Sequence, residues 1–465
     1  MSPPVNIVAR GLSRVRALVK RSGSRRALTS KDLNQLRQQL RECAEARGGE
    51  VSARERAARL ASVYLGLDDS GRHALLRMIA LEFGPDPAKV DVAHSAYQAA
   101  IGSDAQWVAE AELRRAMRSQ RLRILTQFNA IPQGVKFLVD LRADMLRFLK
   151  DDPLLEPLDR ELQSRLSSWF DVGFLELRRI TWQSPAALLE KLVAYEAVHE
   201  IRSWQDLKNR LDADRRCYAW FHPRMPLEPL IFVEVALVDE LAANVQKLLD
   251  IDAPLADATR ATTAIFYSIS STQDGLRGVS LGNFLLKRVV EDLQRDLPRL
   301  KTFSTLSPIP GLVRWATKNA DEANAVLRLH SAKLSAFEGF ETPDFARWLA
   351  VLKERAGWQK DRKLAGALRD PLLALTAHYL LGARHEDGRP LDSVARFHLG
   401  NGARIERLNW LGDTSTKGLA QSLGVMVNYL YVPDRIEANV EAYAGSGSVD
   451  AGPLVRRWIN TRRES

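Results

Sequence analysis

Two spacings of apolar residues divide this chain into a first and a second part. Up to about residue 166 the apolar positions recur every three to four residues, which is the period of amphipathic helices. Val51–Gly66 begins with Ser52 and Glu55 in the spacing of a capping box, and Leu122–Leu149 carries another long helical pattern. Residues 1–166 are therefore predicted to form an all-helical bundle whose apolar stripes bury one another.

In the second part, residues 167–465, short apolar runs of strand character alternate with helical patterns. Strands are predicted at residues 217–223, 230–238, 264–270, 301–306, 403–411 and 423–432. Helices are predicted between them at residues 238–249, 281–296, 343–356 and 361–381. Strands that alternate with helices favour an α/β layer, so the predicted fold class is a helical bundle followed by a mixed α/β domain.

The composition is that of a globular protein with an excess of positive charge. Of 465 residues, 46% are hydrophobic and 27% are charged, and no apolar run is long enough for a transmembrane helix. The formal net charge of +10 invites a nucleic-acid partner. However, the arginines are scattered along helices that also carry acidic residues, so we expect no nucleic-acid partner and no membrane partner. A basic field equally suits an anionic substrate.

Cysteine usage and the two ends of the chain bear on its compartment. Cys43 and Cys217 are too few for a disulfide framework or a zinc site, which implies a reducing compartment. The segment before Asp32 contains Arg and Ser as transit peptides do, and the chain ends Arg-Glu-Ser rather than in a peroxisomal signal. The dense use of Arg and Ala favours a bacterial cytoplasmic protein.

A glycine-punctuated loop between a predicted strand and a predicted helix is the first candidate for binding chemistry. Gly275, Gly278 and Gly282 follow the strand near Ala264–Ile269, and Leu281 opens the helical pattern. Backbone N–H groups in such a loop can cradle a phosphate, although the same glycines could serve only a tight turn. The loop matches neither the nucleoside-triphosphate P-loop nor the dinucleotide fingerprint, and it is similar to the coenzyme A cradle of N-acetyltransferases.

Several longer words in the sequence resemble the malonyl-CoA decarboxylase family. They are FYSISSTQDGLRGVSLGNFLLKRVV at residues 266–290, TLSPIPG at 305–311, FHLGNGA at 397–403 and LNWLGDTSTKGLAQSLGVMVNYLY at 408–431. The resemblance is strong over about residues 218–431. It implies an acetyltransferase-like catalytic domain that binds coenzyme A over residues 167–465. It also implies an oligomerisation role for residues 1–166, a homotetramer, and a place in fatty acid metabolism.

The implied reaction converts malonyl-CoA into acetyl-CoA and carbon dioxide. Loss of carbon dioxide leaves a thioester enolate, so the site needs hydrogen-bond donors for the oxyanion and a proton source for the α-carbon. No metal and no separate cofactor are expected, because the thioester carbonyl accepts the electrons and the coenzyme A moiety belongs to the substrate.

The resemblance also implies the catalytic residues. It places Ser304 on the catalytic serine, which would bind the carboxylate or the thioester carbonyl and relay a proton. It places His398 on the catalytic histidine, which would protonate the α-carbon. By itself a serine at a strand end is usually a turn residue, and Ser307 lies close enough to be confused with Ser304.

The resemblance further assigns residues that would bind the substrate. The coenzyme A loop would be Asp274, Gly275, Leu276, Arg277, Gly278, Val279 and Ser280. Arg277 would meet a phosphate unless it is only a solvated loop charge, and Lys287 and Arg288 are weaker candidates for the 3′-phosphate. Tyr431 would hold His398 or the substrate carboxylate, and Asn401 and Asn428 would line the pocket. A tyrosine in a strand is more often a packing residue.

Two other classes of function remain open from the sequence. An acyl-CoA-dependent acyltransferase of the N-acetyltransferase superfamily would share the coenzyme A cradle but would need an acceptor amine. A basic helical binding protein without catalysis would turn over neither substrate.

Overall fold

The computed structural model describes residues 28–279, 281 and 285–460, and the chain divides into two compact units. Unit 1 comprises residues 1–175, 222–226 and 273–281, and unit 2 comprises the remaining segments. The predicted division after residue 166 falls inside a helix of unit 1, and the chain returns to that unit twice later in the sequence.

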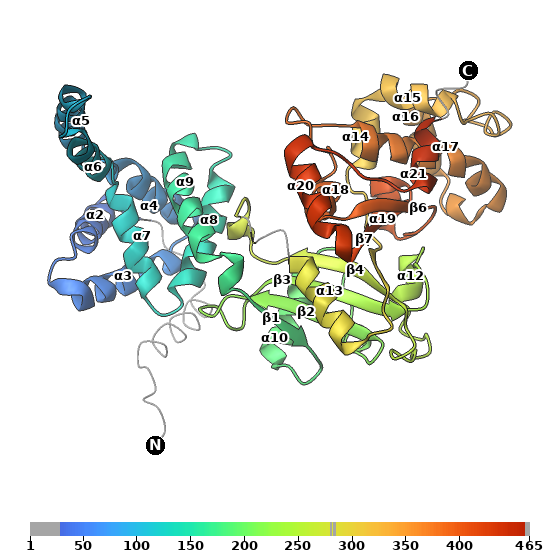
Figure 1. Ribbon diagram of the computed structural model, residues 1–465, viewed down its shortest axis with the longest axis horizontal. Coiled ribbons are helices and arrows are strands. Elements are labelled where there is room, and N and C mark those ends of the chain that lie inside the picture. The colour runs from blue at the N-terminus through green and yellow to red at the C-terminus, as the bar shows by residue number, and fades with distance from the viewer. Residues whose placement is uncertain (1–27, 280, 282–284, 461–465) are drawn as a thin grey trace. The chain divides into compact units, whose positions relative to one another are not determined.

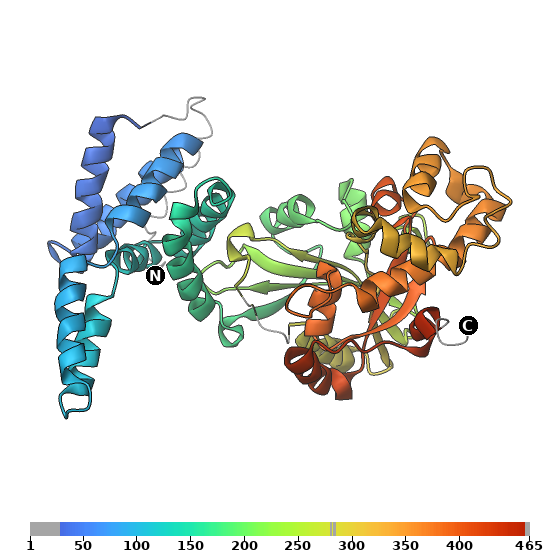
Figure 2. The same ribbon diagram turned by 90° about the horizontal axis from the view of Figure 1, so that it is seen from above.

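Unit 1 is helical throughout its described residues, as its apolar spacing predicts. Its helices are α2 (Ser30–Ala44), α3 (Gly49–Gly66), α4 (Asp69–Glu82), α5 (Pro87–Ala100), α6 (Gln106–Ala116), α7 (Gln120–Ala130), α8 (Gly134–Phe148) and α9 (Glu156–Trp169), with short 3-10 turns η1 (Pro153–Leu155), η2 (Val172–Phe174) and η3 (Asp274–Leu276) (Figure 1). The hairpin of α5 and α6 extends away from the other helices of this unit in both views (Figures 1 and 2).

Two local predictions for unit 1 are wrong. The single helix predicted over Leu122–Leu149 is two helices, α7 and α8, because Pro132 follows the end of α7 and Gln133 adopts a left-handed φ of 58°. The capping box predicted at Ser52 is absent, because α3 already starts at Gly49 and its N-cap, Gly48, makes no side-chain cap. The periodicity predicts correctly that these segments are helical, but it does not predict where the individual helices begin and end.

Unit 2 contains a mixed seven-stranded sheet in the order β1-β2-β3-β4-β5-β7-β6. Its strands are β1 (Glu176–Ile180), β2 (Arg215–Phe221), β3 (Pro229–Val238), β4 (Thr263–Ser271), β5 (Thr302–Thr305), β6 (Arg404–Asn409) and β7 (Met426–Tyr431). Among the strand pairs of the described residues, β4 and β5 are parallel and the others are antiparallel. A parallel pair needs a crossover, and α13 (Leu285–Asp296) lies in that connection. The predicted fold class, a helical bundle followed by a mixed α/β domain, is confirmed.

Helices cover both faces of the sheet in unit 2, so strand β2 is buried along its whole length. Its residues Cys217, Ala219 and Phe221 share one apolar cluster with α10 (Ala186–Tyr195) and α11 (Trp204–Arg210). The alternate residue Trp220 lies under the Arg288 guanidinium of α13 on the other face. Because both faces of β2 are buried, its sequence reads as a continuous apolar run rather than as an alternation of apolar and polar residues. This run is the feature that predicts the strand.

The remaining helices of unit 2 lie mostly between β5 and the C-terminal end. They are α12 (Val245–Leu248), α14 (Leu312–Lys318), α15 (Ala320–Arg328), α16 (Phe345–Glu354), α17 (Arg362–Gly382), α18 (Ser393–Gly400), α19 (Thr416–Ser422), α20 (Ile436–Ser446) and α21 (Pro453–Asn460), with 3-10 turns η4 (Trp358–Lys360) and η5 (Pro433–Arg435). The helix predicted over residues 238–249 shrinks to the single turn α12, because Val238 still belongs to β3. Strand β1 was not predicted, because its residues are mostly exposed and charged.

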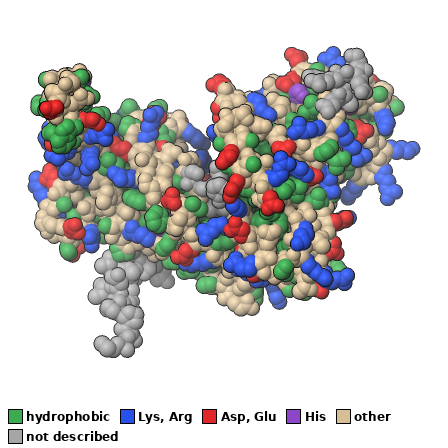
Figure 3. Space-filling view, in the orientation of Figure 1, with side chains coloured by type: hydrophobic (Ala, Val, Ile, Leu, Met, Phe, Trp, Pro, Cys, Tyr) green, Lys and Arg blue, Asp and Glu red, His purple; other side chains and the backbone are tan. Residues whose placement is uncertain are grey.

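The described helices and the surface charge bear on membrane and nucleic-acid partners. Within the described residues, no helix combines the length and apolar character needed to cross a membrane. On the face drawn in Figure 3, the Lys and Arg side chains are interspersed with acidic ones rather than gathered in one continuous patch.

Candidate active site

Helix α18 carries the histidine that the sequence analysis singled out. Its N-cap is Asp392, whose carboxylate accepts hydrogen bonds from the backbone N–H groups of Val394 and Ala395 at 3.0 and 2.9 Å. Ala395, His398 and Leu399 are buried, and their spacing of three and four residues places them on one face of the helix. The histidine is thus turned inward by the same periodicity that buries the apolar side of α18.

Three side chains hold the His398 ring. Its Nε2 lies 3.1 Å from the Ser307 Oγ, and its Nδ1 lies 2.8 Å from the Tyr431 hydroxyl. The ring also stacks on Tyr429, with centroids 4.5 Å apart and an interplanar angle of 24°. Two neighbours on β7 and one residue just beyond β5 therefore fix both the position and the orientation of the imidazole.

The hydrogen-bond directions around His398 assign its tautomer. The Ser307 hydroxyl donates to the Thr305 Oγ1 at 2.8 Å, so its oxygen accepts a hydrogen bond from the His398 Nε2–H. Nδ1 then accepts from the Tyr431 hydroxyl. This arrangement gives a row of hydrogen bonds from Tyr431 through His398 to Ser307 and Thr305.

Burial keeps the His398 imidazole neutral. The side chain is almost entirely removed from solvent, and this desolvation lowers its pKa to about 3. Burial likewise holds the pKa of the Tyr431 phenol well above its ordinary value. Near neutral pH both groups in the row are therefore uncharged.

The Ser304 hydroxyl lies inside the sheet and has its hydrogen-bond partner there. Ser304 is fully buried in β5, and its Oγ donates to the Tyr429 carbonyl at 3.0 Å. The hydroxyl that contacts His398 is that of Ser307, three residues further on, where a bridge to Val427 ties the chain to β7. The catalytic role carried over to Ser304 stays a prediction, and the geometry favours Ser307. The signal in the sequence was the position of Ser307 just before Pro308, at the end of the strand.

A mostly apolar cavity of about 380 Å³ opens beside His398 and Ser307 within unit 2. Its wall is formed by Val198, Ile231, Phe266, Tyr267, Ile269, Ser271, Ser307, Pro308, Ser393, Val394, Phe397 and His398. An apolar cavity with a few convergent polar groups is the usual form of a small-molecule site. We call it the catalytic cavity below.

The two asparagines expected to line the pocket have structural partners. Asn401 follows α18, and its Nδ2 donates to the Phe397 carbonyl at 2.8 Å. Asn428 donates to the Thr305 carbonyl at 2.6 Å and accepts from Arg407 at 3.0 Å. Neither side chain belongs to the wall of the catalytic cavity. Both instead stabilise the strands and the helix that carry the hydrogen-bonded row.

The predicted coenzyme A loop belongs to unit 1, whereas His398 and Ser307 belong to unit 2. The chain leaves β4 and packs the turn η3 on α8, where a Cβ on Gly275 would lie 1.8 Å from the Val139 carbonyl oxygen. The buried Arg142 guanidinium donates to the carbonyls of Gly275 and Arg277 at 2.8 and 2.7 Å. These contacts place the loop in the helical unit, although the sequence analysis assigned it to the catalytic domain.

The residues of this loop differ in whether their N–H groups or side chains are available to bind a phosphate. The N–H groups of Leu276, Arg277 and Val279 already donate within the loop. The Arg277 side chain is exposed and lies 3.4 Å from Asp274, and Gly278 has a left-handed φ of 77°. Ser280 lies outside the described residues. Further on, Lys287 pairs with Glu437 at 2.5 Å.

Within the described residues, no group of three or more His, Cys, Asp or Glu side chains is placed to hold a metal ion. Both Cys43 and Cys217 are buried free thiols.

Comparisons with known proteins give a consistent result over both units. A family model described as the malonyl-CoA decarboxylase C-terminal domain matches residues 173–465, and one described as the malonyl-CoA decarboxylase N-terminal domain matches residues 83–170. The mitochondrial malonyl-CoA decarboxylase of the goose Anser anser anser is 38% identical over 426 residues, covering 88% of this chain and 84% of the relative. The mouse enzyme is 37% identical over 425 residues, covering 87% and 85%.

Solved structures agree with this match. The crystal structure of malonyl-CoA decarboxylase from Rhodopseudomonas palustris superposes with a TM-score of 0.82 at 43% identity, covering 91% of this chain and 99% of that one. The structure from Cupriavidus metallidurans gives a TM-score of 0.71 at 46% identity, covering 92% and 100%.

Proposed function

The chain belongs to the malonyl-CoA decarboxylase family, and we propose that its decarboxylation of malonyl-CoA proceeds through the pair of Ser307 and His398. The observation that carries this proposal is the buried row Tyr431–His398–Ser307 at the wall of the catalytic cavity. The cavity offers apolar walls to the reacting end of the thioester and only a few polar groups to orient it.

The reaction breaks one carbon–carbon bond and forms one carbon–hydrogen bond. The bond between the carboxylate carbon and the α-carbon breaks, its electron pair moves into the thioester as an enolate, and carbon dioxide leaves. A proton from His398 then forms the new bond at the α-carbon, which gives acetyl-CoA. Transfer of the carboxylate from water into the apolar cavity favours this step, because the charge spreads over the enolate as the bond breaks.

The low pKa of His398 suits a proton donor that is loaded by its substrate. In the free site, burial keeps the imidazole neutral, with a pKa of about 3. A substrate carboxylate in the same cavity raises that pKa, because an opposite charge a few ångströms away stabilises the imidazolium. His398 is therefore protonated when the substrate carboxylate binds, and it gives up this proton when the enolate is protonated at the α-carbon. A proton from solvent restores the balance for each turnover.

To stabilise the charge that develops on the thioester oxygen, the Ser307 hydroxyl turns its proton from the Thr305 Oγ1 to the substrate. This hydroxyl lies 3.1 Å from the His398 Nε2, so a substrate atom in contact with one group lies near the other. Ser304 has no comparable position, since its hydroxyl donates to the Tyr429 carbonyl inside the sheet. We therefore assign the oxyanion role to Ser307.

Matched serine variants test this assignment. Purified protein is incubated with malonyl-CoA, without metal and without an acceptor amine, and acetyl-CoA and carbon dioxide are measured. Ser307→Ala should lower kcat by about a hundredfold, as loss of one oxyanion donor does in other enzymes, and His398→Asn should lower it further. Ser304→Ala should lower it less than about tenfold, because it removes one hydrogen bond inside the sheet. A larger loss in Ser304→Ala than in Ser307→Ala would reverse the assignment.

Homo-oligomerisation through the helical part, with four subunits, stays a proposal supported by the hairpin of α5 and α6. Neither helix has a buried residue, and Val92 and Trp107 are each 72% exposed. An apolar face of this kind on a soluble helix marks an interaction site. Light scattering should give four times the mass of the chain, and Trp107→Glu should reduce it. An unchanged mass in Trp107→Glu would exclude the hairpin as the contact.

The remaining expectations concern substrate binding and compartment. We propose that Arg277 in the loop beginning at Asp274 meets a phosphate of coenzyme A, so Arg277→Ala should raise KM more than it lowers kcat. We propose that no cofactor is needed, so dialysis against a chelator should leave the rate unchanged. A cytoplasmic location is proposed from the two free thiols, and cell fractionation tests it.

A further inference from the structure

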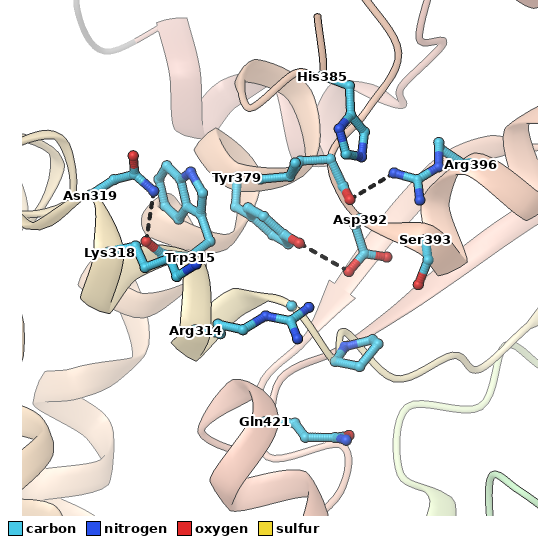
Figure 4. Close-up of a pocket in the computed structure, with 13 residues that line it drawn as sticks. Arg314, Trp315, Lys318, Asn319, Tyr379, His385, Asp392, Ser393, Arg396 and Gln421 are labelled. Atoms are coloured by element: carbon cyan, nitrogen blue, oxygen red, sulfur yellow. Dashed lines mark hydrogen bonds between the residues drawn. The ribbon is translucent and has the colours of Figure 1, made fainter. Parts of the chain in front are cut away.

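A second cavity in unit 2 gathers positive charge without an ion pair to neutralise it. It has a volume of about 500 Å³ and lies between α14, α18 and the ends of α17 and α19. Arg314, Lys318 and Arg396 are its cations (Figure 4). We call it the cationic hollow. It is separate from the catalytic cavity, except that Ser393 contributes to the walls of both.

The cations of the hollow are poorly compensated. In the part of the chain that the structure describes, Arg314, Lys318 and Arg396 make no ion pair within 4.0 Å, and the Arg396 Nη1 donates only to the Pro390 and Leu391 carbonyls, at 2.8 Å each. On the nearby helix α16, by contrast, Arg347 pairs with Glu341 at 3.0 Å. Like charges that converge without a counter-ion repel one another, and a bound anion relieves that repulsion.

The one carboxylate in the hollow is already engaged. Asp392 is buried, and its carboxylate accepts hydrogen bonds from the backbone N–H groups of Val394 and Ala395. It also accepts a hydrogen bond from the Tyr379 hydroxyl at 3.3 Å. Both Arg314 and Arg396 lie near enough to the Tyr379 phenol to lower its pKa, although burial and Asp392 raise it overall. Asp392 therefore organises the floor of the hollow without forming a salt bridge to its cations.

The wall of the hollow is preformed. A Cβ on Gly311 would lie 2.0 Å from the Tyr379 hydroxyl, so only glycine lets the start of α14 approach this closely. Trp315 is buried and packs on Tyr379 with ring centroids 5.2 Å apart. In Figure 4 the Arg314 guanidinium points from α14 toward the middle of the lining residues. A site whose shape is fixed before binding loses less entropy when it is filled.

We propose that the cationic hollow binds a phosphate-bearing anion with at least two negative charges. Two guanidinium groups and an ammonium match the oxygens of a phosphate or diphosphate, and Asn319 and Gln421 add amide groups at the rim. The phosphate has two sources: the phosphorylated tail of the thioester substrate, or a separate phosphate compound. The position of the hollow suits both, because α18 carries Asp392 at its start and His398 in its last turn.

Direct binding tests the site without relying on the proposed decarboxylase activity. Inorganic pyrophosphate is titrated into the full chain by calorimetry, with the double variant R314Q/K318Q and a control, R347Q/K353Q, that removes the same charge from α16. The wild type and the control should bind with equal affinity, and R314Q/K318Q should bind at least about tenfold more weakly, because it loses two charge-assisted contacts. R314K/K318R should retain binding, and circular dichroism confirms folding. No saturable binding to the wild type, or equal weakening in the control, would overturn the proposal.

Kinetics then distinguish the two sources of phosphate. If the tail of the substrate fills the hollow, R314Q/K318Q raises KM for malonyl-CoA but not for malonyl-pantetheine, which lacks the phosphates. Pyrophosphate then competes with malonyl-CoA. If a separate compound fills it, both thioesters keep their KM, and pyrophosphate changes kcat without competing. Either pattern supports a phosphate site.

Discussion

Replacement of Tyr431 by phenylalanine removes one oxygen atom from the hydrogen-bonded row and leaves the rest of the site in place. The lost hydroxyl lies 2.8 Å from the His398 Nδ1, in a region closed to solvent. An imidazole nitrogen left without its partner in such a place is destabilised by about 1–3 kcal/mol. The imidazolium formed during turnover would lose more than the neutral ring, because its Nδ1–H makes a charge-assisted hydrogen bond to the hydroxyl oxygen, and this difference of about 1–3 kcal/mol raises the barrier.

That free energy corresponds to a decrease in kcat of about fivefold to a hundredfold, since each 1.4 kcal/mol changes a rate tenfold. KM should change less than about threefold, because the hydroxyl contacts His398 and does not belong to the wall of the catalytic cavity. The assay is acetyl-CoA release from malonyl-CoA at saturating substrate, followed by chromatography.

The same strand offers a matched control two residues away. Tyr429 is also fully buried and touches His398, but through ring stacking, and its hydroxyl has no hydrogen-bond partner among the described residues. Tyr429→Phe should therefore keep kcat within about threefold of the wild type and should not lower stability. A kcat for Tyr431→Phe within twofold of the wild type, or an equal loss in Tyr429→Phe, would refute the positioning role of the Tyr431 hydroxyl.

Other predictions follow from burial. The folded pKa of His398 is about 3, below the unfolded value near 6.5, so the unfolded chain gains a proton that the folded chain does not and stability falls as pH drops through 6.5. Between pH 6.5 and 5 this amounts to about 2 kcal/mol, so His398→Asn should lose about that much less in urea unfolding; an equal loss in both proteins would contradict the assigned pKa. Gly311→Ala places a Cβ 2.0 Å from the Tyr379 hydroxyl and should lower the free energy of unfolding by more than about 2 kcal/mol; an unchanged melting temperature would show that the tyrosine can move freely. Burial raises the pKa of Cys43 to about 11 and that of Cys217 well above its usual value, so a thiol reagent should react slowly with the folded protein and with both thiols in urea; rapid reaction of the folded chain would show that one thiol is accessible.

The sequence located the sheet better than the boundaries of its elements. Strands β3 and β4 stand out because strands that are buried on both faces read as nearly continuous apolar runs. Strand β1 does not stand out, since it lies at the edge of the sheet and pairs only with β2. The break between α7 and α8 carried its signal in Pro132, which outweighs the periodicity on either side.

The sequence indicates where His398 lies more directly than it indicates which serine contacts it, and the catalytic roles of His398 and Ser304 stay predictions. His398 lies in a recognisable word on a helix, and its inward direction follows from helical spacing. Ser304 and Ser307 are three residues apart, and their different surroundings come from the pairing of this segment with β7, whose residues Val427 and Tyr429 lie much later in the chain. The placement of Gly275 depends likewise on Arg142 in α8. Such contacts between distant segments leave no local signature in a single sequence.

The way the chain threads between its two units limits how the protein can be divided. Residues 273–281 interrupt the sheet-forming part, yet they are held by α8 through the Arg142 guanidinium. A fragment that begins after Leu175 would carry this segment without the helix that supplies Arg142 to the carbonyls of Gly275 and Arg277. The part of the chain after Leu175 should therefore not fold as an independent catalytic domain. A fusion with an unrelated protein would need both units of this chain.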